Sequence, residues 1–230
     1  MKIHGLNKLT LLDYPTKTAC TVFTGGCNFR CPFCQNASLV LDPESQPTTP
    51  ENEFFDFLRS RKNILEGVCI TGGEPTLSSD LPEFIAKIKA EGMAVKLDTN
   101  GNNFAMLKKL VDEKLVDYVA MDVKNSLPRY AKTIGLETFD TTNIEKSVEF
   151  LKTCGIDYEF RTTIAVELQN ENAMEKIGQL VDGASKFFLQ RYRDGGDMVG
   201  AIMTPPSLET LQKFKAIMEK YVKLVEIRGI

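Results

Sequence analysis

The sequence predicts an α/β fold with a parallel sheet, in a single domain that covers residues 1–230. Short runs of β-branched and apolar residues alternate with segments whose apolar residues recur at the 3.6-residue period of a helix. Strands that alternate with helices in this way are joined by right-handed crossovers and lie parallel. We count six strand-and-helix units, two fewer than a closed eightfold barrel contains.

The predicted strands are short and apolar. They cover residues 18–23, 67–71, 94–98, 116–122, 158–164 and 186–190, and residues 222–227 form a last strand-like segment. Because the ligand site of a parallel βα fold forms at the carboxyl ends of its strands, the polar residues at these ends are the first candidates for a site.

Helices are expected between these strands. Thr49 and Pro50 offer an N-cap followed by a first helical proline, Asp80 and Ser207 offer further N-caps, and Gly92 ends a helix. Residues 37–49 and 194–206 contain turn-forming residues and are expected to be irregular, the second segment crossing the surface. The apolar helix faces comprise Phe54, Phe55 and Leu58; Leu81, Phe84, Ile85 and Ile88; Leu107, Leu110 and Val111; Ile144, Val148 and Leu151; Met174, Ile177, Leu180 and Val181; and Leu208, Leu211, Phe214 and Met218.

Three cysteines follow the first predicted strand. Cys27, Cys31 and Cys34 lie within eight residues, so one loop can direct three thiols to one metal centre. A structural zinc site would close with a fourth Cys or His, and an ordinary iron-sulfur carrier with a fourth thiolate. Since neither stands nearby, a cubane cluster held by these thiols leaves one iron open to a substrate's amine and carboxylate. A zinc knuckle or a disulfide loop remains the structural alternative.

The spacing of these cysteines, with Phe33 just before the last, resembles the radical S-adenosylmethionine superfamily, and Gly72-Gly73-Glu74-Pro75 resembles that family's second motif. The resemblance implies a partial (β/α)6 barrel, a 4Fe-4S cluster on the three cysteines and bound S-adenosylmethionine. Residues 5–15, 34–36 and 97–101 further resemble the group that activates glycyl-radical enzymes, and within it activators of anaerobic ribonucleoside-triphosphate reductase.

The resemblance also implies roles for residues at the strand ends. Gly72, Gly73 and Glu74 are expected to bind the methionyl amine. Asp98 and Asp122 are expected to help hold S-adenosylmethionine, in some relatives together with a monovalent cation. The remaining residues expected to bind the cofactor are Phe33, Thr99, Lys124 and Arg161. Lys124 is also a possible counter-charge for Asp122, and for Arg161 a structural salt bridge is the alternative.

Composition limits the classes of function. A net charge of −3 with scattered basic residues is atypical of a nucleic-acid binder, and no apolar run reaches the length of a membrane span. A cytoplasmic protein is expected, in which Cys20, Cys69 and Cys154 are isolated thiols, the first two of them core residues, and His4 lies at the surface. A flavodoxin or ferredoxin is the electron donor that the resemblance implies. A radical enzyme for another substrate and a non-catalytic iron-sulfur protein remain alternatives.

Overall fold

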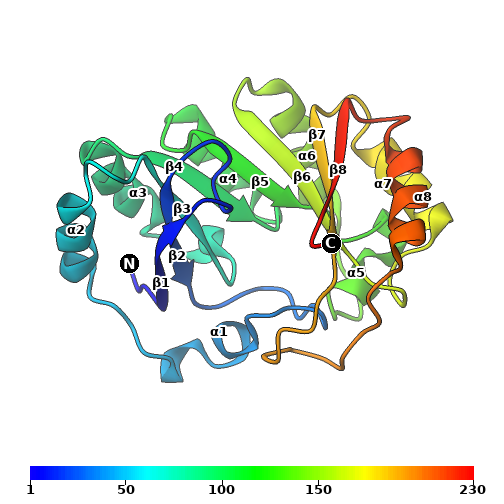
Figure 1. Cartoon of the computed structure of the whole chain (residues 1–230), viewed down its shortest axis with the longest axis horizontal. Coiled ribbons are helices and arrows are strands. Elements are labelled where there is room, and N and C mark those ends of the chain that lie inside the picture. The colour runs from blue at the N-terminus through cyan, green and yellow to red at the C-terminus, as the bar shows by residue number, and fades with distance from the viewer. The chain divides into compact units, whose positions relative to one another are not determined.

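The computed structural model describes residues 1–230, which form eight strands and eight α-helices (Figure 1). The chain falls into two compact units. Unit 1 comprises residues 1–28, 36–99 and 105–119, and unit 2 comprises residues 29–35, 100–104 and 120–230. One boundary between the units lies within the cysteine loop, after Asn28, and another lies between Val119 and Ala120. The expectation of a single domain remains a prediction.

The strands lie close to their predicted positions. Their bounds are β1 Gly5–Thr10, β2 Ala19–Thr24, β3 Gly67–Gly72, β4 Ala94–Thr99, β5 Tyr118–Asp122, β6 Asp157–Ile164, β7 Lys186–Arg191 and β8 Leu224–Arg228. Each strand from β2 to β7 is followed by at least one helix, so the six predicted strand-and-helix units are confirmed. The strand-like tail is also confirmed, because β8 pairs in parallel with β7.

Six helices, α2, α3, α4, α6, α7 and α8, lie where apolar periodicity was found, whereas α1 and α5 were not predicted. Their bounds are α1 Ala37–Leu41, α2 Glu51–Ser60, α3 Leu81–Ala90, α4 Phe104–Asp112, α5 Tyr130–Thr133, α6 Thr142–Thr153, α7 Glu171–Leu180 and α8 Leu208–Met218, with short 3-10 turns at η1 Pro43–Ser45, η2 Pro75–Leu77 and η3 Leu127–Arg129. Ser207 caps α8 as predicted, since its side chain accepts a hydrogen bond from the Thr210 N–H. No helix is long and apolar enough to cross a membrane.

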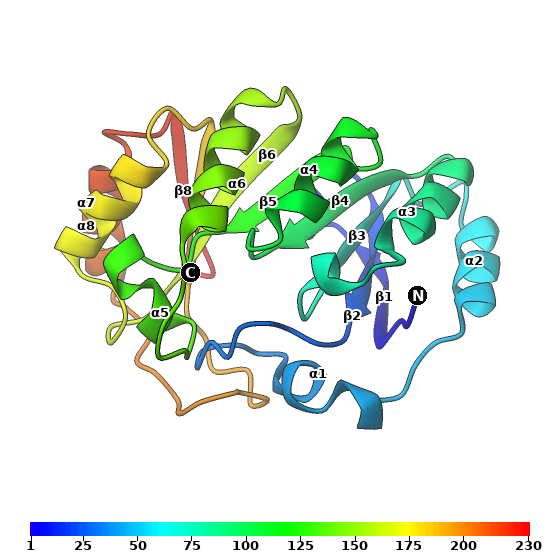
Figure 2. The same ribbon diagram turned by 180° about the vertical axis from the view of Figure 1, so that it is seen from behind.

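In unit 1, β2, β3 and β4 pair in parallel, and β1 pairs antiparallel with β2. Successive side chains of a strand alternate between its faces. β4 therefore presents Val95 and Leu97 on one face and Lys96 and Asp98 on the other. Both apolar side chains are fully buried, and α3 contacts β4 (Figure 2). The opposite face, with its two charged residues, is the one that concerns function.

In unit 2, β6, β7 and β8 pair in parallel. The helices α7 and α8 lie side by side, and α8 contacts both β7 and β8 (Figures 1 and 2). Along β6, Glu159 and Arg161 share one face with Thr163, while Tyr158, Phe160 and Thr162 are buried on the other.

Three local expectations need correction. The first strand, β1, was not predicted, because three of its six residues are exposed and its polar residues give no apolar alternation. The segment 37–49 is not wholly irregular, since it contains α1 and η1. Pro50 is the N-cap of α2 rather than its first residue, so that helix begins one position later than Thr49 suggested.

Candidate active site

The Gly-Gly-Glu motif forms a turn at the carboxyl end of β3, in unit 1. Gly72 has a φ of +114°, a conformation that glycine tolerates and other residues rarely adopt. Gly73 donates its N–H to Thr24 O at 2.8 Å, and Glu74 donates its N–H to Gly26 O at 2.8 Å. A Cβ on Gly73 would lie 1.9 Å from the Gly26 oxygen, so a side chain there would displace backbone. The backbone thus joins this turn directly to the start of the cysteine loop.

The Glu74 carboxylate is buried inside this turn, with 1% of the residue exposed. Its Oε1 accepts the Thr76 N–H at 3.1 Å and the Thr99 hydroxyl at 2.7 Å. Glu74 therefore braces the turn and orders the end of β4, and two residues expected to bind the cofactor form one hydrogen-bond network. The amide of Asn36 donates to Gly72 O at 2.9 Å, which fixes the carbonyl of the first glycine. No role for Asn36 was predicted.

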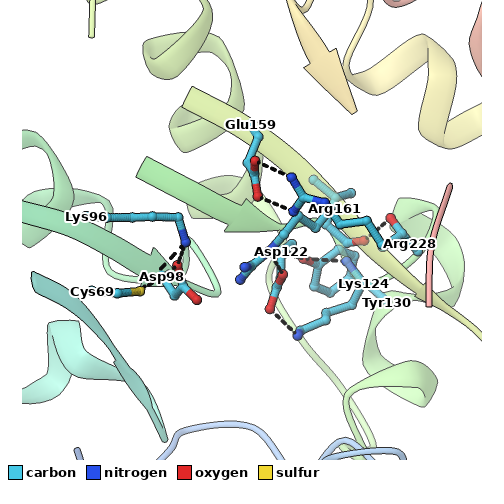
Figure 3. Close-up of polar contacts among 11 residues, drawn as sticks. Cys69, Lys96, Asp98, Asp122, Lys124, Tyr130, Glu159, Arg161 and Arg228 are labelled. Atoms are coloured by element: carbon cyan, nitrogen blue, oxygen red, sulfur yellow. Dashed lines mark hydrogen bonds and ion pairs between the residues drawn. The ribbon is translucent and has the colours of Figure 1, made fainter. Parts of the chain in front are cut away.

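Asp98 stands at the carboxyl end of β4, and its carboxylate accepts a hydrogen bond from the ammonium of Lys96 (Figure 3). The Cys69 sulfur lies 3.8 Å from the Lys96 Nζ and 3.7 Å from Asp98 Oδ1. The register of the sheet places Cys69 opposite Lys96 on neighbouring strands. Lys96 is 1% exposed, whereas the Asp98 side chain is 15% exposed, so the cation of this ion pair is buried and the carboxylate is partly buried. Neither Lys96 nor a polar setting for Cys69 was predicted.

Asp122 stands at the carboxyl end of β5 and is paired with two cations of unit 2 (Figure 3). Its Oδ1 lies 2.8 Å from Arg161 Nε, and its Oδ2 lies 2.9 Å from Lys124 Nζ. Lys124 is thus the counter-charge that the sequence suggested. Arg161 makes the salt bridge that was its alternative role, so any contact with a ligand would be additional to this pair.

Burial and ion pairing shift the pKa values of Asp122 and Lys124 in opposite directions. Burial alone would raise the pKa of Asp122, but the charges of Arg161 and Lys124 outweigh it and lower the pKa to about 2. Burial would lower the pKa of Lys124, but the charge of the Asp122 carboxylate outweighs burial and raises that pKa above its ordinary value. Both groups are therefore charged at neutral pH, without any ligand.

Lys124 also links Asp122 to the cysteine loop. Its ammonium lies 5.7 Å from the centre of the Phe33 ring, which is a cation-π distance. The Tyr130 hydroxyl accepts the Lys124 backbone N–H at 3.3 Å, and burial raises the pKa of Tyr130. Phe33 and Lys124, both predicted for the cofactor site from separate motifs, are thus brought together, and Cys31 is close to them in the same unit.

The second half of the cysteine loop is fixed by the long irregular segment after β7. The N–H groups of Val199 and Gly200 donate to Cys34 O at 3.3 Å and Pro32 O at 3.0 Å. The Gln35 side chain donates to Arg193 O at 2.6 Å. The segment that the sequence left irregular therefore holds the peptide that carries two of the three thiols.

None of the six cysteines forms a disulfide. Cys20 is buried in β2, as predicted for a core residue, and burial raises the pKa of its thiol to about 12. His4, which was expected at the surface, is partly exposed, although its Nδ1 is buried without a hydrogen-bond partner and its Nε2 lies 2.6 Å from where a Gly25 Cβ would be.

Residues 21–181 match the model of the radical SAM superfamily, and the chain belongs to this family. A Methanocaldococcus jannaschii protein, MJ1227, named as a candidate glycyl-radical enzyme activating enzyme, is 31% identical over 99% of this chain and 96% of its own. The pyruvate formate-lyase-activating enzyme of Staphylococcus epidermidis is 27% identical over 54% of this chain and 53% of its own. The protein is thus an enzyme of the radical SAM class with relatives among activating enzymes.

The fold agrees with this membership. The crystal structure of Streptococcus suis SuiB superposes with a TM-score of 0.70 at 15% identity, over 92% of this chain and 49% of SuiB. This chain thus spans about half the length of SuiB. The expected α/β fold, an open and partial barrel of the radical SAM type, is confirmed.

Radical SAM membership implies a 4Fe-4S cluster and S-adenosylmethionine, and the residues present fit both. The donor set is three thiols outside any disulfide, which suits iron-sulfur ligation. Gly72 and Gly73 have no room for side chains, because backbone atoms of Thr24 and Gly26 occupy that space, and this close packing holds the turn against the start of the cysteine loop. Cys27 belongs to unit 1, whereas Cys31 and Cys34 belong to unit 2.

Proposed function

We propose that this enzyme activates a glycyl-radical enzyme, with anaerobic ribonucleoside-triphosphate reductase as its partner. The observation that carries the proposal is the 31% identity to MJ1227, which extends over nearly the whole of both chains. A shared domain alone would give a match over part of each. The overall resemblance of the sequence to reductase activators adds the choice of partner.

In this proposal Cys27, Cys31 and Cys34 bind the 4Fe-4S cluster through their thiolates. Three ligands leave the fourth iron open to the amine and carboxylate of S-adenosylmethionine. The turn at Gly72 and Gly73 holds the methionyl amine, with Glu74 bracing the turn from inside. Phe33, within the cysteine loop, and Lys124, whose ammonium lies over the Phe33 ring, help exclude water from the ligand.

When bound, the cluster and S-adenosylmethionine would supply reductive cleavage, in which one electron breaks the bond from the sulfonium to the ribose 5'-carbon and gives methionine and a 5'-deoxyadenosyl radical. This radical removes a hydrogen atom from the α-carbon of a partner glycine. The products are 5'-deoxyadenosine and a glycyl radical, so atoms and electrons balance. A flavodoxin or ferredoxin provides the electron. The reaction belongs in the cytoplasm, where thiols stay reduced.

The first experiment is anaerobic reconstitution with iron and sulfide, then reduction with dithionite, addition of S-adenosylmethionine and assay of 5'-deoxyadenosine. Cys31→Ala is the test variant and Cys154→Ala is its matched control, because Cys154 is a thiol outside the cysteine loop. We expect Cys31→Ala to abolish the product and Cys154→Ala to retain it.

The second experiment adds purified anaerobic ribonucleotide reductase and records the electron paramagnetic resonance spectrum. A glycyl-radical doublet is expected with the native reductase, and none with a reductase whose radical glycine is replaced by alanine. Formation of 5'-deoxyadenosine without a doublet would refute this partner and favour a radical enzyme for another substrate. A reduced cluster that never cleaves S-adenosylmethionine, even with the partner present, would favour the non-catalytic alternative.

A further inference from the structure

Lys96 is a buried ammonium in the middle of a parallel strand. Its side chain is 2% exposed, and its polar neighbours are the Asp98 carboxylate on the same strand and the Cys69 sulfur on β3. Removing an ammonium from water costs several kcal/mol unless it is paired in good geometry. Asp98, with 15% of its side chain exposed, is the only carboxylate that this ammonium is seen to pair with.

The Lys96–Asp98 pair lies next to residues that are predicted to bind S-adenosylmethionine. Asp98 directly precedes Thr99, whose hydroxyl donates to Glu74 at 2.7 Å. Cys69 lies on the strand that ends in the Gly-Gly-Glu turn. The two strands that hold the pair therefore lead directly to the predicted S-adenosylmethionine contacts of unit 1.

We infer that Lys96 is a positioning residue that serves as the fixed counter-cation of Asp98, in the place that a bound monovalent cation was expected to fill. This inference rests on the proposed role of Asp98 in S-adenosylmethionine binding. The ammonium holds the carboxylate in one orientation, so that its oxygens can accept hydrogen bonds from the ligand. Asp122 likewise has fixed counter-cations, Lys124 and Arg161. Neither carboxylate thus needs a cation from solution.

A purely structural role is the competing explanation. A buried ion pair is usually no more stable than well-packed apolar residues of similar volume. If Lys96 and Asp98 served only to stabilise the fold, leucine and valine at these two positions would therefore stabilise it equally well. The two explanations differ in what a small cation does: it can replace a missing ammonium beside Asp98, but it cannot restore lost packing.

The experiment measures the dissociation constant of S-adenosylmethionine on the reconstituted enzyme, in choline chloride and in potassium chloride at equal ionic strength. Lys96→Ala opens space beside Asp98, whereas Lys96→Met removes the charge but keeps the space filled. Asp98→Ala removes the partner, and Lys87→Ala is the control, because Lys87 is half-exposed on α3. The melting temperature of each apoprotein is recorded in both salts, as a readout that needs no cofactor.

Wild type and Lys87→Ala are expected to bind equally in both salts. Lys96→Ala is expected to bind about tenfold more weakly in choline and to recover most of this loss in potassium, which also raises its melting temperature. Lys96→Met and Asp98→Ala are expected to stay weak in both.

Wild-type binding that requires potassium or sodium would overturn the inference, and so would Lys96→Ala binding as tightly as wild type in choline. The wild-type comparison decides the question even where Lys96→Ala does not fold. A wild type that needs the cation yet forms a glycyl radical on the reductase overturns this inference alone. A cation-independent wild type that never forms the glycyl radical overturns the proposed function alone.

Discussion

Replacing Asp122 by asparagine tests the charge network of unit 2. The carboxylate lies 2.8 Å from Arg161 and 2.9 Å from Lys124, two cations whose side chains are 12% and 14% exposed. Asparagine can accept a hydrogen bond from one of them, but its amino group then faces the other, and its charge is gone. Breaking a buried pair by removing one partner costs about 3 to 5 kcal/mol. Because Asp122 itself is 25% exposed, we take the lower end, about 3 kcal/mol.

The lowered pKa of Asp122 gives a second, independent magnitude. A fall from 3.8 to about 2 makes the folded state favour the ionised carboxyl by about 2 kcal/mol. Since the pKa is lower in the folded protein than in the unfolded chain, this stabilisation is complete above about pH 4 and is lost as the pH falls towards 2. The difference between wild type and Asp122→Asn should therefore narrow over that interval.

The assay is urea unfolding of the apoprotein with reductant, at pH 7 and at steps from pH 5 to pH 2.5. A loss of about 3 kcal/mol corresponds to a fall in melting temperature of roughly 6 to 12 °C for a chain of this size. Asp112→Asn is the control, because Asp112 and its partner Lys108 are both about half-exposed and their pair contributes at most about 0.5 kcal/mol. A loss below about 1 kcal/mol for Asp122→Asn, or a difference that does not change with pH, would refute the reasoning.

Three further changes test separate features. Gly73→Ala places a Cβ 1.9 Å from Gly26 O. It should lower the free energy of unfolding in urea by about 1 to 3 kcal/mol and reduce the amount of iron bound after reconstitution. An unchanged iron content would count against the close approach of the Gly73 turn to the start of the cysteine loop. Arg228→Met removes the guanidinium that contacts the buried Glu159 carboxylate at 2.8 and 3.0 Å. Breaking a fully buried pair costs about 3 to 5 kcal/mol, and because Arg228 is 37% exposed we expect a loss of about 2 kcal/mol in the free energy of unfolding. A melting temperature equal to that of wild type would contradict this expectation. Ser207→Ala removes the N-cap of α8 and should cost about 1 kcal/mol, which Ser207→Asp should largely recover.

The sequence could predict the parts of the site that depend on short-range spacing. The cysteines lie within eight residues, and the Gly-Gly-Glu motif and the aspartates each end a recognisable apolar strand. In a parallel fold the strand ends alone place such residues at one edge, whatever the packing of the helices. The strand β1 escaped prediction because an exposed edge strand does not need the apolar alternation that marks a buried one.

The partners of these residues could not be predicted in the same way. A lysine in a strand usually indicates a solvent-exposed position, and nothing in the local sequence of Lys96 indicates that its side chain is buried. Its burial depends on a neighbouring strand that places Cys69 opposite it, and on Asp98 two residues further on. Asn36 likewise acquires its role only when α1 brings it to the carbonyl of Gly72.

The counter-charges change how the site can work. Three of the carboxylates described above are paired with a cation of the same unit: Asp98 with Lys96, Asp122 with Lys124 and Arg161, and Glu159 with Arg228. The buried Glu74 carboxylate instead accepts hydrogen bonds from Thr76 and Thr99. A site whose charges are neutralised and oriented by its own strands needs little rearrangement when a ligand binds. Such a site gains little from the positive charge of S-adenosylmethionine, because its carboxylates are already compensated. Affinity for the ligand should then depend more on hydrogen bonds and on the cluster than on net charge, and raising the salt concentration should weaken binding only slightly.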